Sequence, residues 1–151
     1  LEFRRQTADL RRAVHGALGS AAEIQDRLAH LKKAVLETPG SSSSTLTSLR
    51  ALEKDLNDLL VELRGDRSRQ KRNEAAPPSI LSRVERIVSI QWHTTSAPTQ
   101  TARDAYRFAA DAFEGALPKL KDIEARLVGL EADLEATGAP WTPGRIPNWQ
   151  K

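Results

Sequence analysis

The chain has 151 residues, of which 39% are hydrophobic, 28% are charged and only 5% are aromatic, and its formal net charge is +3. This composition is typical of one globular domain with a core of Leu, Ala, Val and Ile, which favours helix-on-helix packing over a β-sandwich. The absence of cysteine excludes disulfides, thiolate metal ligands and cysteine nucleophiles. No apolar run reaches the roughly eighteen residues that a membrane-spanning helix needs.

Methionine is absent as well. Because a complete translation product begins with methionine, we expect the chain to be a fragment or a processed form of a longer protein. The first residues, Leu1 to Phe3, are a candidate cloning remnant.

Two stretches carry apolar residues at alternating steps of three and four, the spacing that keeps side chains on one face of a helix. The first seam has one polar member and comprises Phe3, Thr7, Leu10, Val14, Ala17, Ala21, Ile24, Leu28, Leu31 and Val35. The second has no polar member and comprises Ala102, Tyr106, Ala109, Phe113, Ala116, Leu120, Ile123, Leu127, Leu130 and Leu134. Such seams must be buried against other helices, so the sequence predicts an all-α bundle.

The first predicted helix covers residues 3–37 and would be about 50 Å long. It ends at the breaker Thr38-Pro39-Gly40. A second helix with a leucine seam is predicted over 44–63, with Ser43 or Ser44 as its favoured cap.

Residues 64–78 have no apolar periodicity and carry five cations and two acids, so they account for the whole net charge of +3. This composition is typical of a mobile linker. The sequence Arg64-Gly65-Asp66 matches the tripeptide that integrin-type receptors read, but nothing else in the chain supports that use. The linker has no aromatic residue to stack on bases, and its charge lies outside a helix, so nucleic-acid binding is not expected.

A third helix is predicted over 79–93 and opens at Pro78-Ser79. Its apolar face comprises Leu81, Val84, Ile87, Val88 and Trp92. A fourth helix is predicted over 99–137, with Ser96 as its cap. Pro118 removes one hydrogen bond inside this helix, but the seam keeps its phase across it. We therefore expect one continuous helix with a bend near Glu114–Pro118.

The final segment, residues 138–151, holds two of the three tryptophans and three of the eight prolines. Such a segment cannot be helical, and its tryptophans are expected to lie on a surface. The candidate docking residues of this tail are Trp141, Pro143, Arg145, Pro147 and Trp149.

Short turns at 38–43 and 94–98 make the helices consecutive antiparallel pairs. The simplest closure is an antiparallel up-down-up-down bundle of four helices, two long and two short, with both termini at the same end. In the alternative, the two short helices stack end to end as the third rod of a three-rod bundle. Their summed length favours the alternative, and the linker is long enough for either.

No residue pattern typical of catalysis, cofactor binding or metal binding is present. His15 and His30 are about 22 Å apart along one helix, too far to share a metal ion, and no Glu-x-x-His pair accompanies them. The chain has no Gly-rich phosphate loop and no nucleophile elbow. Acids of the last helix alternate with cations and are interpreted as solvated charges: Asp104, Asp111, Glu124 and Glu131. We therefore expect no cofactor and no enzymatic activity.

The segment from Leu134 to Trp149, with Gly138, Pro140-Trp141 and Pro143-Gly144-Arg145, resembles the closing segment of large bacterial secreted proteins. Those proteins carry sortilin-like BNR-repeat β-propellers and are often labelled glycosyl hydrolases. Pro98-Thr99 before the last helix, followed by Tyr106, is similar to the same pattern. The resemblance implies a C-terminal helical module of an exported protein, secreted or periplasmic, and it implies no catalytic residue here.

The expected function is therefore that of a non-catalytic structural or protein-interaction module. Its partner would be a neighbouring domain of the parent chain or another protein. The alternative is a bundle that makes weak contact with a lipid or other anionic surface. That alternative rests on the linker and on four basic residues at the start of the first helix: Arg4, Arg5, Arg11 and Arg12. The sequence does not predict an oligomeric state.

Overall fold

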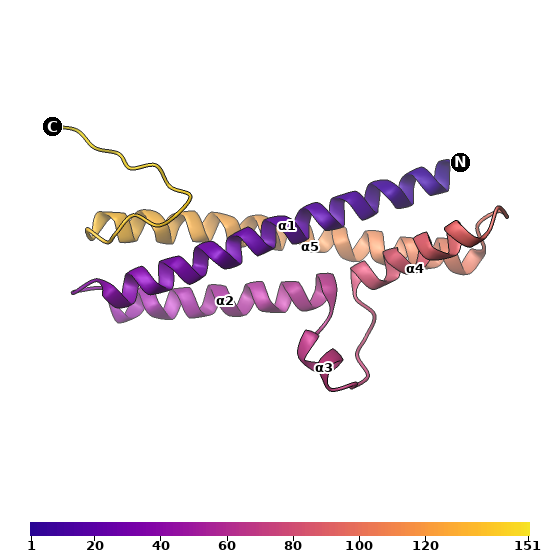
Figure 1. Cartoon of the computed structure of the whole chain (residues 1–151), viewed down its shortest axis with the longest axis horizontal. Coiled ribbons are helices and arrows are strands. Elements are labelled where there is room, and N and C mark those ends of the chain that lie inside the picture. The colour runs from indigo at the N-terminus through magenta and orange to yellow at the C-terminus, as the bar shows by residue number, and fades with distance from the viewer.

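The computed structural model describes all 151 residues as an elongated helical bundle with an extended C-terminal tail (Figure 1). Two long helices, α1 (Glu2–Glu37) and α5 (Gln100–Ala136), run the length of the bundle. A third rod is shared by α2 (Ser43–Arg64) and α4 (Ile80–His93), and the short helix α3 (Arg67–Lys71) projects from the break between them. The chain has no strand, so the all-α class is confirmed.

The two long helices lie parallel to each other. Near their N-termini, Phe3 of α1 packs edge-to-face on Tyr106 of α5, with the ring centroids 5.6 Å apart. Further along both helices, Arg27 of α1 pairs with Glu131 of α5. Both contacts keep nearly the same offset in residue number, which only parallel helices do.

The third rod runs antiparallel to both long helices and is made of two pieces laid end to end (Figure 1). Lys32 of α1 pairs with Glu53 of α2 at 3.0 Å, so α2 covers the C-terminal half of α1. Arg11 pairs with Glu85 of α4 at 2.8 Å, so α4 covers the N-terminal half. The four-helix up-down-up-down closure is not confirmed, and the end-to-end alternative describes this arrangement.

Helix length explains the choice between the two closures. α2 has 22 residues and α4 has 14, and together they match the 36 residues of α1 and the 37 of α5. Laid end to end, the short helices cover the whole seam of both long ones. Laid side by side, they would leave half of each long seam in water. As a result, the N-terminus lies at the opposite end of the bundle from the end of α5 (Figure 1).

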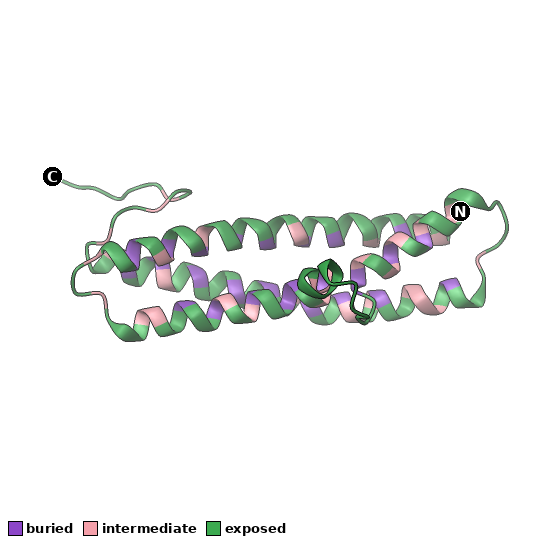
Figure 2. Ribbon diagram, turned by 60° about the horizontal axis from the view of Figure 1, so that its bottom comes forward, coloured by how far each residue is buried: buried purple, intermediate pink, exposed green.

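The core consists of the predicted seams, which face inward along all three rods (Figure 2). The one polar member, Thr7, is fully buried and satisfied. Its hydroxyl donates to the carbonyl of Phe3 at 2.8 Å and accepts from Nε2 of Gln91 at 3.3 Å. The largest fully buried side chains are mostly leucines: Leu28, Leu31, Leu49, Leu52, Leu56, Leu63 and Leu127.

The structure corrects two predicted seam positions. Trp92, predicted on the apolar face of its helix, is 83% exposed, because the buried face of α4 is formed by Ile80, Val84 and Ile87. In α5, Leu130 is only half-buried and Glu131 is buried in its place. Leu130 and Glu131 lie three and four residues after the core residue Leu127, and both steps satisfy helical spacing. Spacing alone could therefore not choose between Leu130 and Glu131.

The helix starts also differ in detail from the predicted caps. Ser42, rather than Ser43 or Ser44, caps α2, because its side chain accepts from the amide of Thr45. Thr99, rather than Ser96, caps α5 in the same way, because the helix begins at the residue after it. Ser79 caps α4, as predicted.

The linker contains structure that the sequence did not predict. The side chain of Asp66 accepts hydrogen bonds from the amides of Ser68 and Arg69 at 2.9 and 3.2 Å, which caps α3. Gly65 precedes it with a φ of +88°, a conformation that favours glycine. Residues 65–78 therefore leave the bundle as a compact projection, which we call the hook.

α5 continues as one helix across Pro118, as the phase of its seam predicts. The proline leaves the carbonyl of Glu114 without its helical donor. We expect Pro118→Ala to raise the free energy of unfolding by about 1–3 kcal/mol, because it restores the donor and removes the ring clash. Chemical denaturation measures this change. Gly115→Ala, at a helical position with open space around it, should add only about 1 kcal/mol or less. A gain for Pro118→Ala no larger than this would contradict the expectation.

Candidate functional site: the C-terminal tail and the ends of the bundle

The tail begins with a turn that sends the chain back over α5. Thr137 ends the helix, and its hydroxyl donates to the carbonyl of Leu134 at 2.7 Å. The amide of Ala139 donates to the same carbonyl at 3.2 Å. Between them Gly138 has a φ of +78°, the left-handed conformation typical of the residue after a helix.

Three charged side chains, which we call the arginine clasp, then hold the tail against the bundle: Arg27, Glu131 and Arg145. Arg145 contacts Glu131 twice, because Nε lies 3.3 Å from Oε2 and Nη1 donates to the backbone carbonyl at 3.1 Å. Its Nη2 also donates to Oε2 of Glu135 at 2.5 Å. From the opposite side, Arg27 of α1 pairs with Oε1 of Glu131. One carboxylate therefore joins α1, α5 and the tail.

Burial sets the energetics of the clasp. The Glu131 side chain is 3% exposed, whereas those of Arg27 and Arg145 are 23% and 22% exposed. An unpaired carboxylate at such a position would be strongly destabilising. Sequence reasoning placed Glu131 among the solvated acids. The step of four residues from Leu127 offers Glu131 as a seam position, but the step of three to Leu130 fits helical spacing equally well, so the sequence alone did not select Glu131.

The clasp divides the tail into two parts with different surroundings. In the proximal part, residues 138–145, the Trp141 ring lies under the guanidinium of Arg145, with 5.3 Å from Cζ to the ring centroid. Trp141, which is 40% exposed, also lines a small pocket with Leu31 and Leu134 of the core. In the distal part, residues 146–151, the chain leaves the bundle, and Ile146 and Trp149 are 91% and 80% exposed (Figure 1).

The five predicted docking residues thus have different places. Trp141 and Arg145 contact the bundle through the clasp. Pro143 lies exposed in the turn between them, and Pro147 and Trp149 lie in the distal part.

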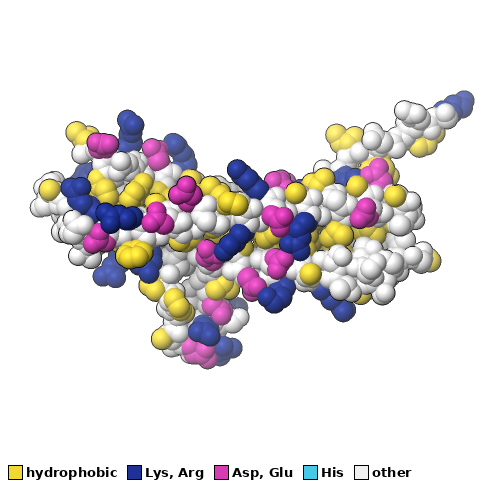
Figure 3. All heavy atoms as spheres, turned by 180° about the vertical axis from the view of Figure 1, so that it is seen from behind, with side chains coloured by type: hydrophobic (Ala, Val, Ile, Leu, Met, Phe, Trp, Pro, Cys, Tyr) yellow, Lys and Arg dark blue, Asp and Glu magenta, His cyan; other side chains and the backbone are white.

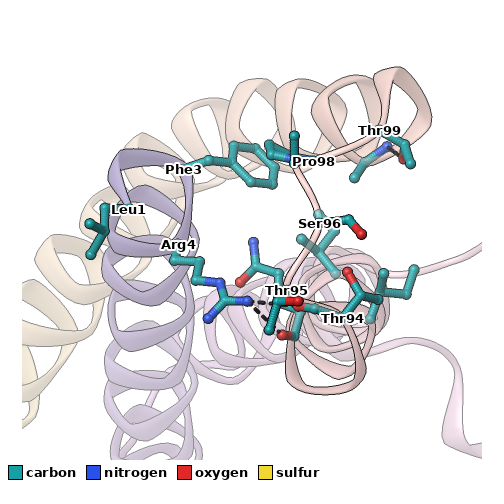
Figure 4. A pocket seen from close by; sticks show the side chains of 13 residues that line it. Leu1, Phe3, Arg4, Thr94, Thr95, Ser96, Pro98 and Thr99 are labelled. Atoms are coloured by element: carbon teal, nitrogen blue, oxygen red, sulfur yellow. Dashed lines mark hydrogen bonds between the residues drawn. The ribbon is translucent and has the colours of Figure 1, made fainter.

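The opposite end of the bundle carries a groove of about 680 Å³ (Figure 4). Phe3 and Arg4 of α1 form one side of it, and the loop from Thr94 to Thr99 forms the other. Arg4 does not project freely into the groove, because Nη2 donates to the carbonyls of Gln91 and Thr94 at 3.2 and 2.7 Å. No acidic side chain and no histidine line the groove.

Several of the remaining charged groups pair across helices. Six of them line a groove of about 480 Å³ between α2 and α5: Asp55, Asp58, Glu62, Lys119, Asp122 and Arg126. In this groove Lys119 pairs with Glu62 at 2.9 Å and Arg126 pairs with Asp55 at 2.7 Å. Both signs alternate over the surface, as Figure 3 shows for one face. Oε1 of Glu85 is shared by Arg11 at 2.8 Å and by Nε2 of His15 at 3.0 Å. His30 and His93 are exposed. No three histidine, aspartate or glutamate side chains are grouped so that they could hold a metal ion.

Comparison with models of known protein families, with curated proteins and with solved structures finds no match to this chain. The resemblance of the C-terminal segment to sortilin-like BNR-repeat proteins therefore stays a prediction. None of the helices has the length and the apolar character that crossing a membrane requires.

The clasp predicts a specific protease sensitivity. Trypsin cuts after Arg145, but this residue is held on Glu131 and Glu135. We expect Glu131→Leu to speed this cut at least tenfold, because Arg145 loses its main partner. The free energy of unfolding should fall by no more than about 1–2 kcal/mol, because leucine removes the buried charge and the two guanidinium groups that it leaves unpaired are already partly exposed and can turn toward water.

The control for this measurement lies within the same chain. Trypsin also cuts after Lys71 and Arg72, which are exposed in the hook and far from the clasp in sequence. That rate should not change in the variant. Equal cleavage after Arg145 in both proteins would mean that Glu131 does not hold the tail.

A second prediction concerns how the stabilising contribution of Glu85 depends on pH. Hydrogen bonds from Arg11 and from His15 lower the pKa of Glu85 below its ordinary value of 4.5. Glu85 therefore stabilises the fold at pH values above 4.5, and this contribution is lost as the pH falls through the lowered pKa. We expect Glu85→Gln to cost about 0.5–1 kcal/mol at pH 7, because the pair is partly exposed. The difference from the wild type should shrink below pH 4.5 in denaturation measured across pH, and a difference that grows there would contradict the assignment.

Proposed function

We propose that the chain is a non-catalytic interaction module whose distal tail, residues 146–151, docks on another protein. One observation carries the proposal. Ile146 and Trp149 are 91% and 80% exposed on an extended segment, while the seams of all the long helices are already buried within the bundle. Large aromatic and aliphatic side chains of this kind supply most of the binding energy in protein interfaces.

The arginine clasp supports the proposal because it fixes where the distal tail leaves the bundle. A segment anchored at Arg145 loses less conformational freedom on binding than one that is free from Gly138 onward. The bundle then acts as a rigid base, and the distal tail as the part that contacts the partner.

The alternative, binding to a lipid or other anionic surface, has less support from the contacts of the first helix. Arg4 is engaged with backbone carbonyls, Arg11 with Glu85 and Arg12 with Asp9. Of the four basic residues at the start of α1, only Arg5 has no such partner. The start of α1 is therefore less attractive to anions than its four arginines suggest.

The resemblance of the last segment to exported BNR-repeat proteins suggests one kind of partner. If the parent chain carries a β-propeller, the distal tail would dock on that domain, and the protein would be secreted or periplasmic. This assignment rests on the resemblance alone, whereas the docking role of the distal tail rests on its exposure.

Site-specific photocrosslinking tests the docking role. A photoreactive phenylalanine analogue is placed at Trp149, and in a control at Val61, which is 47% exposed on α2, in cells that express the full-length protein. We expect one discrete adduct, or an intramolecular crosslink to another domain, from position 149 and not from position 61. Adducts that do not differ between the two positions would contradict the proposal.

Truncation separates docking from folding. Removing residues 146–151 should leave the melting temperature within about 2 °C of the wild type, because these residues make no contact with the core. Removing residues 138–151 should lower it by several degrees, because Glu131 loses Arg145 and the end of the core loses Trp141. Equal melting temperatures for the two truncations would show that the proximal part is not integrated in the fold.

A further inference from the structure

The hook, residues 65–78 between α2 and α4, projects from the side of the bundle (Figure 1). It contributes nothing to the buried core, and every residue from Arg67 to Pro78 is exposed. A projection that buries no core residue is free to meet another molecule.

The charges of the hook and of Arg64 beside it are only partly compensated within the chain. Arg72 pairs with Glu74 at 2.7 Å, and Arg69 lies 3.7 Å from Asp66. Three further cations make no ion pair and no side-chain hydrogen bond: Arg64, Arg67 and Lys71. The three positive charges of these side chains equal the net charge of the whole protein, +3.

Arg64 connects this charge to a concave surface. It is half-buried at the end of α2 and lines a groove of about 460 Å³ between the hook and the start of α4. Burial and the neighbouring charge of Arg67 lower the pKa of Arg64 below its ordinary value. The two carboxylates that line the same groove, Glu74 and Glu85, already have cationic partners. The groove therefore presents a guanidinium without a counter-ion.

We propose that the hook and this groove form a docking surface for an acidic polypeptide segment, whose carboxylates pair with Arg64, Arg67 and Lys71. The proposal is independent of the role of the distal tail, because the two surfaces share no residue. Paired guanidinium and carboxylate groups form strong, directional hydrogen bonds, and a partly buried arginine gains more from such a pair than an exposed one.

The composition of the hook favours a polypeptide over a membrane or a nucleic acid. Residues 64–78 contain no aromatic and no long aliphatic side chain that could enter a lipid interface. The same absence of aromatics leaves no platform for stacked bases. Asp66 and Glu74 stand on either side of the four cations between positions 67 and 72, which suits a partner with defined positions of charge better than a uniformly anionic surface.

The test measures binding of a fluorescein-labelled oligoglutamate peptide to the whole chain by anisotropy. We expect saturable binding at about 50 mM NaCl that weakens at about 300 mM NaCl. The triple variant Arg64→Gln/Arg67→Gln/Lys71→Gln should bind the peptide at least about tenfold more weakly.

The matched control neutralises three exposed cations elsewhere that make no ion pair: Arg5→Gln/Arg50→Gln/Lys121→Gln. Both triple variants lower the net charge from +3 to 0, so a difference between them reports position and not total charge. Circular dichroism verifies that each variant is as helical as the wild type.

Three outcomes would overturn the proposal. The first is no binding of the peptide at the lower salt concentration. The second is equal weakening in both triple variants. The third is binding of phosphatidylserine-containing vesicles, or of a single-stranded oligonucleotide, as tightly as the peptide through the same three residues, which would assign the surface to a membrane or to a nucleic acid instead.

Discussion

The packing of α1 against α5 along their whole length is the constraint on which the rest of the structure depends. Both helices present a continuous apolar seam, and parallel packing leaves one long groove between them that a third rod must fill. No single remaining helix is long enough, because α2 has 22 residues and α4 has 14. The chain fills the groove with both, end to end, and so the break between them falls in the middle of the bundle.

That break explains where the exposed features lie. Because the third rod is interrupted, the residues that join its halves leave the bundle and form the hook. Because the long helices are parallel, the start of α1 and the end of α5 lie at opposite ends (Figure 1). The distal tail, the hook and the groove at the N-terminal end are therefore three separate surfaces on one rigid rod.

Much of this fold could be predicted from the sequence because helical periodicity is a local property. The seams and the breakers between them located α1, α2, α4 and α5 to within one residue at each end, and the unbroken phase around Pro118 predicted a single α5. The short α3, which carries no apolar seam, was not predicted. The topology was not fixed in this way, since a linker of fifteen residues permits either closure. The clasp was missed for a related reason. Whether Leu130 or Glu131 points inward depends on the helices that pack against that turn, and the cation that makes a buried Glu131 tolerable comes from α1.

The clasp also shows what a buried ion contributes to a bundle of this kind. Burying the Glu131 carboxylate has a large desolvation cost, which its two arginine partners offset, so the ion pairs of the clasp are weak evidence for added stability. The carboxylate instead determines where the helices and the tail lie relative to one another. Leucine and alanine seams tolerate small shifts along a helix, whereas a carboxylate held by guanidinium groups from two directions has one favourable place. Arg27 thus fixes the register of α1 on α5, and Arg145 fixes the point at which the tail leaves. We therefore infer that the charged side chain in the seam serves specificity of position more than stability.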